Sequence, residues 1–148
     1  MHVNVPIDVA QTVACAGLAL WQKSAADGSA AAATAETVIG GMGPGVPSGQ
    51  GIGLGSVKYI PAAALTGDPT NNATITVNKR TAGGAAVPIA TLTTTAVAGN
   101  WVAWVPVTIP LVANQFISPG DVLTVAITKG GTGVVVPQGQ LEVYPSAV

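Results

Sequence analysis

The glycine-rich stretch at residues 40–55 is the part of the sequence that comes nearest to a known chemical device. Half of its residues are glycine, and the letters GIGLG at 51–55 are close to the fingerprint that holds dinucleotide phosphates. That fingerprint lies between a buried strand and a helix, whose N-terminus meets the pyrophosphate. Here Pro44 and Pro47 come before the glycines, and the strand-like residues 56–60 follow them. The sequence therefore argues against a nucleotide site.

A metal or catalytic centre would have to be built from very few side chains. His2 is the only histidine and Cys15 the only cysteine, which is too few for a zinc site within one chain. Asp121 and Glu142 stay open as a glycosidase pair, because a fold can bring distant carboxylates together. In the alternative interpretation, Asp121 opens a strand after the turn at 118–120, and Glu142 faces solvent. We predict no enzyme activity, no metal and no cofactor.

Charge is scarce in this chain. Charged residues make up 7% of it and the net charge is −1, whereas roughly a quarter of an ordinary soluble domain is charged. Five Lys and Arg residues do not form the basic stripe that phosphate binding needs, so we expect no direct nucleic-acid partner. No window approaches ~20 consecutive apolar residues, so we expect no membrane span. A surface with so few charges resists association poorly, which indicates an assembly component.

Short strands separated by turn residues fill the chain from Ser56 onward. Alternation and β-branched residues predict strands at 56–61, 73–80, 87–93, 100–109, 121–128 and 139–144. The glycine pair in the turn at 81–84 suits a hairpin, and Pro88 must lie at an edge or a bulge. The best helical candidate, the alanine-rich segment 25–37, has no apolar stripe to pack. The predicted fold class is all-β, an antiparallel β-sandwich of jelly-roll type.

Residues 1–55 are rich in alanine and glycine, and we predict that they form an extended N-terminal arm beside a sandwich domain at 56–148. Ordering a glycine-rich segment costs more conformational entropy than its few apolar side chains return on burial. We therefore expect the arm to lie against a neighbouring subunit, with Met42, Ile52 and Leu54 as contact residues.

Trp101 and Trp104 are the aromatic residues of greatest interest. They lie three apart on a predicted strand, so they face opposite sides of a sheet. One is then expected in the core and the other exposed or at an interface. An exposed Trp can stack on a sugar ring or anchor a protein contact, and the low charge favours the protein contact. One of Trp101 and Trp104 therefore joins Met42, Ile52 and Leu54 as a predicted protein-contact residue.

Two stretches carry a family resemblance: VKYIPAAALTGDPTNNATITVNKRTAGG at 57–84 and ISPGDVLTVAITKGGTGVVVPQGQLEV at 117–143. In the first, a strand ending in Lys-Arg runs into a Gly-rich hairpin. In the second, a Pro-Gly-Asp turn leads into the strand Val-Leu-Thr-Val. In these features the segment 57–144 resembles a small β domain of tailed-bacteriophage virions, found in capsid decoration (cement) proteins and head-fibre proteins.

The resemblance implies a jelly-roll-like sandwich, often trimeric, on the outer surface of the capsid at three-fold or quasi-three-fold positions. It implies a structural virion protein without enzyme activity, which decorates and stabilises the capsid by bridging major capsid subunits. The expected partners are the major capsid protein and two further copies in a homotrimer, after synthesis in the host cytoplasm. Two alternatives stay open: a carbohydrate-binding β-sandwich module, and a structural protein of the tail or fibre.

Overall fold

The computed structural model describes residues 19–41, 51–112 and 116–146. Regular structure in these residues consists of strands and of no helix, and the strands pair antiparallel, so the all-β prediction is confirmed. No helix of the described residues is long and apolar enough to cross a membrane. The strands are β1 (Ala19–Lys23), β2 (Thr34–Gly41), β3 (Ile52–Pro61), β4 (Asn72–Thr81), β5 (Val87–Thr93), β6 (Val107–Ile109), β7 (Phe116–Ile117), β8 (Asp121–Gly130) and β9 (Gly139–Pro145).

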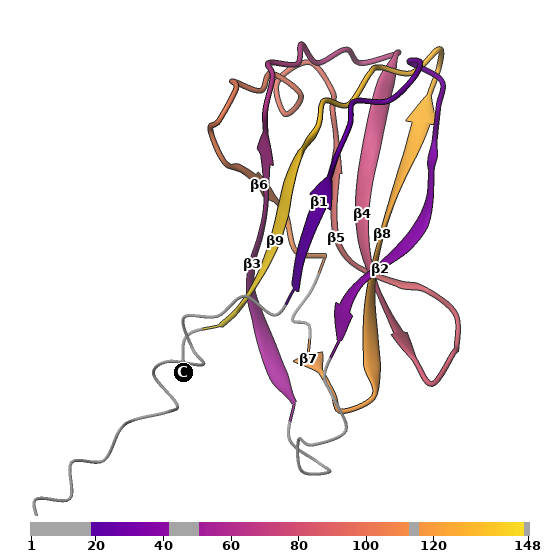
Figure 1. Cartoon of the computed structure of the whole chain (residues 1–148), viewed down its shortest axis with the longest axis vertical. Coiled ribbons are helices and arrows are strands. Elements are labelled where there is room, and N and C mark those ends of the chain that lie inside the picture. The colour runs from indigo at the N-terminus through magenta and orange to yellow at the C-terminus, as the bar shows by residue number, and fades with distance from the viewer. Residues whose placement is uncertain (1–18, 42–50, 113–115, 147–148) are drawn as a thin grey trace, which may run out of the picture.

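The strands form two four-stranded layers of a sandwich (Figure 1). One layer has the order β1-β9-β3-β6 and the other has the order β2-β8-β4-β5, while the short β7 pairs with β3. At one edge a single pairing of Ala19 with Gly40 joins β1 to β2. At the other edge an isolated bridge joins Ala90 of β5 to Leu111, just after β6. The two layers are thus connected along both sides.

The hydrophobic core lies between the layers, because alternate side chains of each strand point inward. In β8, Leu123, Val125 and Ile127 are fully buried, as the alternation predicts. Ile75 and Val77 of β4 share the inward face with them. The opposite layer contributes Val57, Tyr59, Ile109, Leu141 and Val143 to the same cluster.

The hairpin between β4 and β5 forms where the sequence predicts it. Ala82 and Gly83 have φ angles of 48° and 75°, and the Gly84 N–H donates to the Thr81 carbonyl at 2.8 Å. Positive φ at both central residues is the mark of the type I′ turn, whose twist matches that of antiparallel strands. Pro88 lies at a register shift between β4 and β5, on the outermost strand of its layer, as expected.

The predicted division at Ser56 differs from the structure. Both β1 and β2 lie within residues 1–55, yet they occupy places in the layers beside β9 and β8. The sequence does not predict β2 because the strand lies at the edge of its layer and is exposed along most of its length. An exposed strand does not need alternating apolar residues. The alanine-rich segment 25–37 forms no helix, and its last residues belong to β2. Residues 1–18 and 42–50 of the predicted arm lie outside the described residues.

Gly53 and Gly55 belong to β3, and Gly51 directly precedes it, so these glycines do not form a phosphate loop. A Cβ atom on Gly55 would lie 2.5 Å from the Pro145 carbonyl oxygen, at a register shift between β3 and β9. The Ser146 N–H donates to the Gly53 carbonyl at 2.7 Å. Glycine is needed here because two backbones come into contact.

The predicted strand at 100–109 is wrong for most of its length, since only Val107–Ile109 forms one. Trp101 makes an isolated bridge with Leu65, and the chain then turns at Trp104 before it enters β6. This turn brings Trp104 to the groove described next.

Candidate functional site

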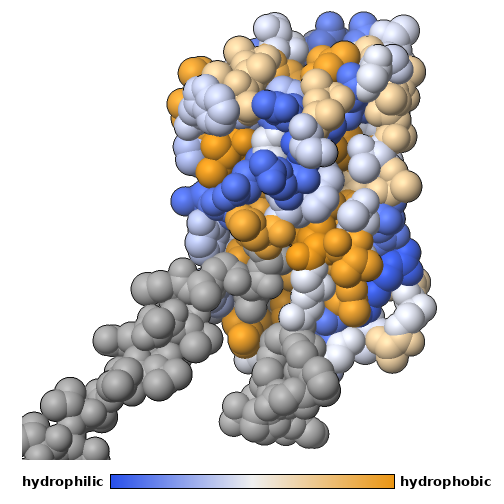
Figure 2. Space-filling model, viewed as in Figure 1, coloured by the Kyte–Doolittle hydropathy of each residue, from blue (hydrophilic) through white to orange (hydrophobic). Residues whose placement is uncertain are grey.

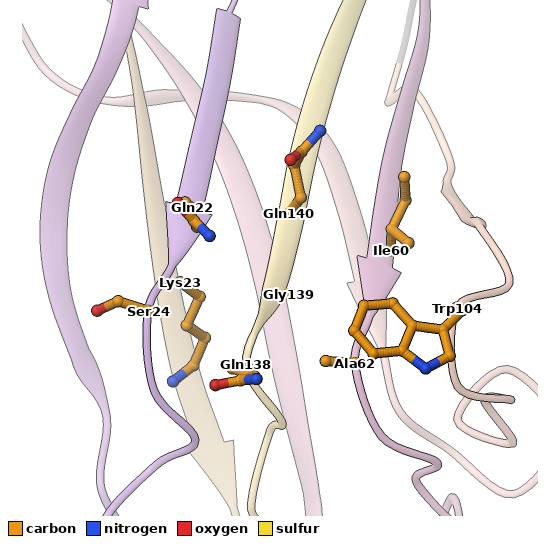
Figure 3. A pocket seen from close by; sticks show the side chains of 9 residues that line it. All are labelled: Gln22, Lys23, Ser24, Ile60, Ala62, Trp104, Gln138, Gly139 and Gln140. Atoms are coloured by element: carbon orange, nitrogen blue, oxygen red, sulfur yellow. The ribbon is translucent and has the colours of Figure 1, made fainter.

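A groove of about 220 Å³ lies where β1 ends, β9 begins and β3 ends (Figure 3). The three strands meet at Gly139, which pairs with Lys23 on one side and with Pro61 on the other. The groove opens on the outer face of the β1-β9-β3 layer, away from the core. It is lined by Gln22, Lys23, Ser24, Ile60, Ala62, Trp104, Gln138, Gly139 and Gln140.

Three glutamine amides line one side of the groove. Gln22 pairs with Gln140 across β1 and β9, and both point outward because their neighbours Trp21 and Leu141 pack against or within the core. The Gln140 amide donates to Glu142 Oε1 at 2.7 Å. Gln22 and Gln138 are exposed residues, and both line the groove. Their donors and acceptors are therefore available to a ligand.

Trp104 borders the other side of the groove, next to Ile60 and Ala62 (Figure 3). Its side chain is 71% exposed, and its φ of 64° is left-handed, a conformation that costs a bulky residue about 1–2 kcal/mol. The backbone N–H of Trp104 donates to the Pro61 carbonyl at 2.7 Å, and this hydrogen bond stabilises the left-handed conformation. Because the Trp104 side chain is exposed, its strained backbone conformation does not improve the packing of the core. Backbone conformations of this kind are found most often at functional sites.

Trp101 differs from Trp104 in burial and in packing. Its side chain is 3% exposed, its ring centroid lies 5.5 Å from that of Tyr59, and its indole N–H donates to the Ala98 carbonyl at 2.8 Å. The expectation of one buried and one exposed Trp is confirmed. The stated reason is wrong, because Trp104 lies in a turn that follows Trp101 and the two residues do not share a strand.

The one cationic residue in the lining, Lys23, already has partners. Its ammonium lies 2.8 Å from Asp27 Oδ1 and donates to the Ala25 carbonyl at 2.6 Å. Burial acts to raise the pKa of Asp27, but hydrogen bonds from Lys129, Lys23 and the Val136 N–H outweigh it, so the pKa is lowered. The carboxylate thus stays ionised beside Lys23, and the groove itself presents mainly neutral polar groups.

A polar network continues from the groove along the outer face of the same layer. Glu142 accepts hydrogen bonds from Gln140 and from the Tyr144 hydroxyl, and the Lys58 ammonium lies 6.0 Å from the Tyr144 ring centroid. The bond to Glu142 raises the pKa of Tyr144. Figure 2 shows hydrophilic residues crossing this face above a group of hydrophobic ones.

No protein-family model, no curated protein and no solved structure matches this chain.

The other predicted contact residues are placed as follows. Leu54 belongs to the buried core, and Ile52 is partly buried and packs against it. Met42 lies outside the described residues. Of the predicted contact residues that the structure describes, Trp104 alone presents most of its side chain to solvent.

The glycosidase alternative fails on geometry. Asp121 is 2% exposed and opens β8 on the inward side, where it accepts from the Ser118 N–H at 2.8 Å and the Thr81 hydroxyl at 2.6 Å. Glu142 points outward from the opposite layer and is half-buried. The two carboxylates therefore do not face one substrate. The described residues hold no group of three or more His, Cys, Asp or Glu side chains placed to bind a metal ion.

The groove was not predicted from the sequence, although part of its signal is there. Gln138 and Gln140 stand two residues apart, the spacing that puts both side chains on one face of a strand. Gln22 lies on β1, which has no recognisable strand pattern. Trp104 lies on a loop, and its position beside the groove depends on the hydrogen bond from its backbone N–H to the Pro61 carbonyl.

Proposed function

We propose that this chain is a structural, non-enzymatic protein of a tailed-bacteriophage virion, which decorates the capsid and bridges major capsid subunits from outside. The strand order carries the proposal. With β7 left aside, the layers have the orders β1-β9-β3-β6 and β2-β8-β4-β5, and all but one connection cross between the layers. This arrangement supports a jelly-roll topology. Jelly rolls recur in viral capsid domains and in lectins.

The surface also supports an assembly role. Large apolar side chains are exposed at several places, notably Val97 at 86%, Val38 at 68%, Leu20 at 64% and Phe116 at 60%. In a chain of which 7% is charged, such side chains favour contact with other subunits. The resemblance of 57–144 to decoration proteins supports a homotrimer that binds the major capsid protein on the outer surface of the virion.

The proposal is tested by mixing the purified full chain with empty shells assembled from the major capsid protein of the same genome. We expect addition in a fixed ratio of copies, a raised disruption temperature of the shells, and a trimer in light scattering. Absence of binding overturns the proposal, and binding to isolated tails instead assigns the chain to the tail or fibre.

The arm is tested separately with a chain that starts at Ala19, because this start keeps every described strand. A start at Ser56 would remove β1 and β2 from the sandwich. If residues 1–18 contribute contacts to neighbouring subunits, the shortened chain folds but binds shells more weakly. Equal binding of the two chains contradicts a role for these residues.

A further inference from the structure

We propose that the groove beside Trp104 binds a neutral saccharide. The indole of Trp104 stacks on the apolar face of one sugar ring, and the amides of Gln22 and Gln138 bind its hydroxyl groups. Sugar binding at this site would be a function separate from capsid decoration, and the proposal does not depend on capsid decoration.

Trp104 supplies the first part of the argument. An indole has a flat apolar face with high electron density, which suits the C–H bonds on one side of a sugar ring. Trp104 is 71% exposed although Trp101, three residues before it, fills the nearby core. Its left-handed backbone is held by the bond to Pro61. The chain thus holds an exposed indole on a strained backbone at the rim of a groove, where core packing does not require it.

The polar groups opposite the indole select the kind of ligand. Gln22, Gln138 and Ser24 are neutral and combine donors with acceptors, as sugar hydroxyls do. An anionic ligand would need an unpaired cation, but the Lys23 ammonium is paired with Asp27. A purely apolar ligand would leave the amides without partners, which costs affinity.

The size of the groove limits the ligand to a short one. Its volume of about 220 Å³ is below the ~300 Å³ at which drug-sized pockets begin, so one ring fills it. A single ring with few contacts gives an affinity on the order of 1 mM. Several copies on one assembly would bind a polysaccharide much more tightly through multivalency.

Part of the lining lies on paired strands, so the geometry of the groove does not depend on loops alone. Gly139 forms its floor, and behind this residue the space is filled by Tyr59, whose hydroxyl would lie 2.7 Å from an added Cβ. Gln22 and Gln140 are fixed by the pairing of β1 with β9. Sites built on strands keep their geometry better than sites on loops.

The test titrates the full chain with methyl glycosides and tetrasaccharides of glucose, galactose, mannose, rhamnose and N-acetylglucosamine. Binding is followed by NMR of the indole N–H and glutamine amide signals. We expect saturable binding of at least one of these sugars, with shifts at Trp104, Gln22 and Gln138. Trp104→Ala should lower the affinity about tenfold or more, whereas Trp104→Phe, which keeps an aromatic face, should lower it less.

Two further variants separate the groove from the loop that carries Trp104. Gln138→Ala should weaken binding several-fold while Trp104 stays in place. Val102→Ala is the matched control, because Val102 is 63% exposed on the same loop but does not line the groove; its affinity should not change.

Three outcomes overturn the proposal. The first is no saturation by any of these sugars up to about 100 mM, well above the expected dissociation constant. The second is binding that Trp104→Ala leaves unchanged. The third is that the wild-type chain binds no sugar and that the Trp104→Ala variant no longer binds capsid shells. The groove would then be a protein interface. Failure of the wild-type chain to bind shells tests capsid decoration alone and leaves the sugar titration valid.

Discussion

Asp27 and Lys129, which are 102 residues apart in the sequence, form an ion pair of 2.5 Å between the β1–β2 loop and β8. Both side chains are almost fully buried, at 3% and 6% exposure. The same carboxylate accepts from the Val136 N–H at 2.9 Å and from Lys23, at the end of β1. The buried carboxylate of Asp27 therefore connects the end of β1, strand β8 and the segment that precedes β9.

Replacing Asp27 by asparagine should destabilise the fold strongly. The change leaves the ammonium groups of Lys23 and Lys129 without their counter-charge, and breaking a buried ion pair costs about 3–5 kcal/mol. Because Lys23 can turn toward solvent, we expect the free energy of unfolding in urea to fall by about 2–4 kcal/mol. Glu36→Gln is the control: Glu36 pairs with Arg80 on the exposed face of the sheet, so its loss should be much smaller. Equal losses in the two variants contradict this account.

The stability of the chain should fall in acid. Hydrogen bonds, first from Arg80 and then from Thr124, lower the pKa of Glu36 to about 2, and the pKa of Asp27 is also lowered. A carboxyl whose pKa is lower when folded stabilises the fold above its unfolded pKa, because the unfolded state binds the proton first. The free energy of unfolding should thus decrease as the pH falls from 4.5 to about 2, measured by urea unfolding at each pH. In Asp27→Asn and in Glu36→Gln the decrease should be shallower, and a flat wild-type profile would contradict the lowered pKa values.

The strands that place every second side chain in the core could be predicted from the sequence, whereas β1 and β2, which lie where the two layers join, could not. In β4 and β8, alternate residues such as Ile75 and Val125 must enter the core, so the pattern is strict. In β2, Val38 is 68% exposed, and pairing with β8 rather than burial holds the strand. A sequence pattern records burial and not backbone pairing, which explains why β1 and β2 were assigned to an arm.

The groove could be predicted only in part for a related reason. The spacing of Gln138 and Gln140 predicts two amides on one face, but it does not show that Gln22 lies beside them. The segment around Trp101 and Trp104 reads as a strand because its β-branched residues are typical of one. Two tertiary contacts, from Trp101 to Leu65 and from Trp104 to Pro61, turn the chain instead.

Gly139→Ala should destabilise the fold from beneath the groove. An added Cβ would lie 2.5 Å from the Ile60 carbonyl oxygen and 2.7 Å from the ring of Tyr59. Tyr59 is fully buried and its hydroxyl donates to the Pro137 carbonyl at 2.7 Å, so it has little room to move. We expect a loss of about 1–3 kcal/mol in thermal or urea unfolding. Gly28→Ala is the matched control, because nothing lies within 4 Å of its added Cβ; a similar loss there would point to a general intolerance of alanine.

Glycine and alanine at position 104 separate backbone strain from the contacts of the indole. Both changes remove the ring, but glycine alone adopts a φ of 64° without a clash between Cβ and the backbone. Trp104→Gly should therefore be more stable than Trp104→Ala by about 1 kcal/mol in urea unfolding. At Val102, in the same turn but without a positive φ, the order should reverse, with glycine less stable than alanine by about 0.5–1 kcal/mol. The same order at both positions would mean that Trp104 carries no backbone strain, and its exposed indole would then need another explanation.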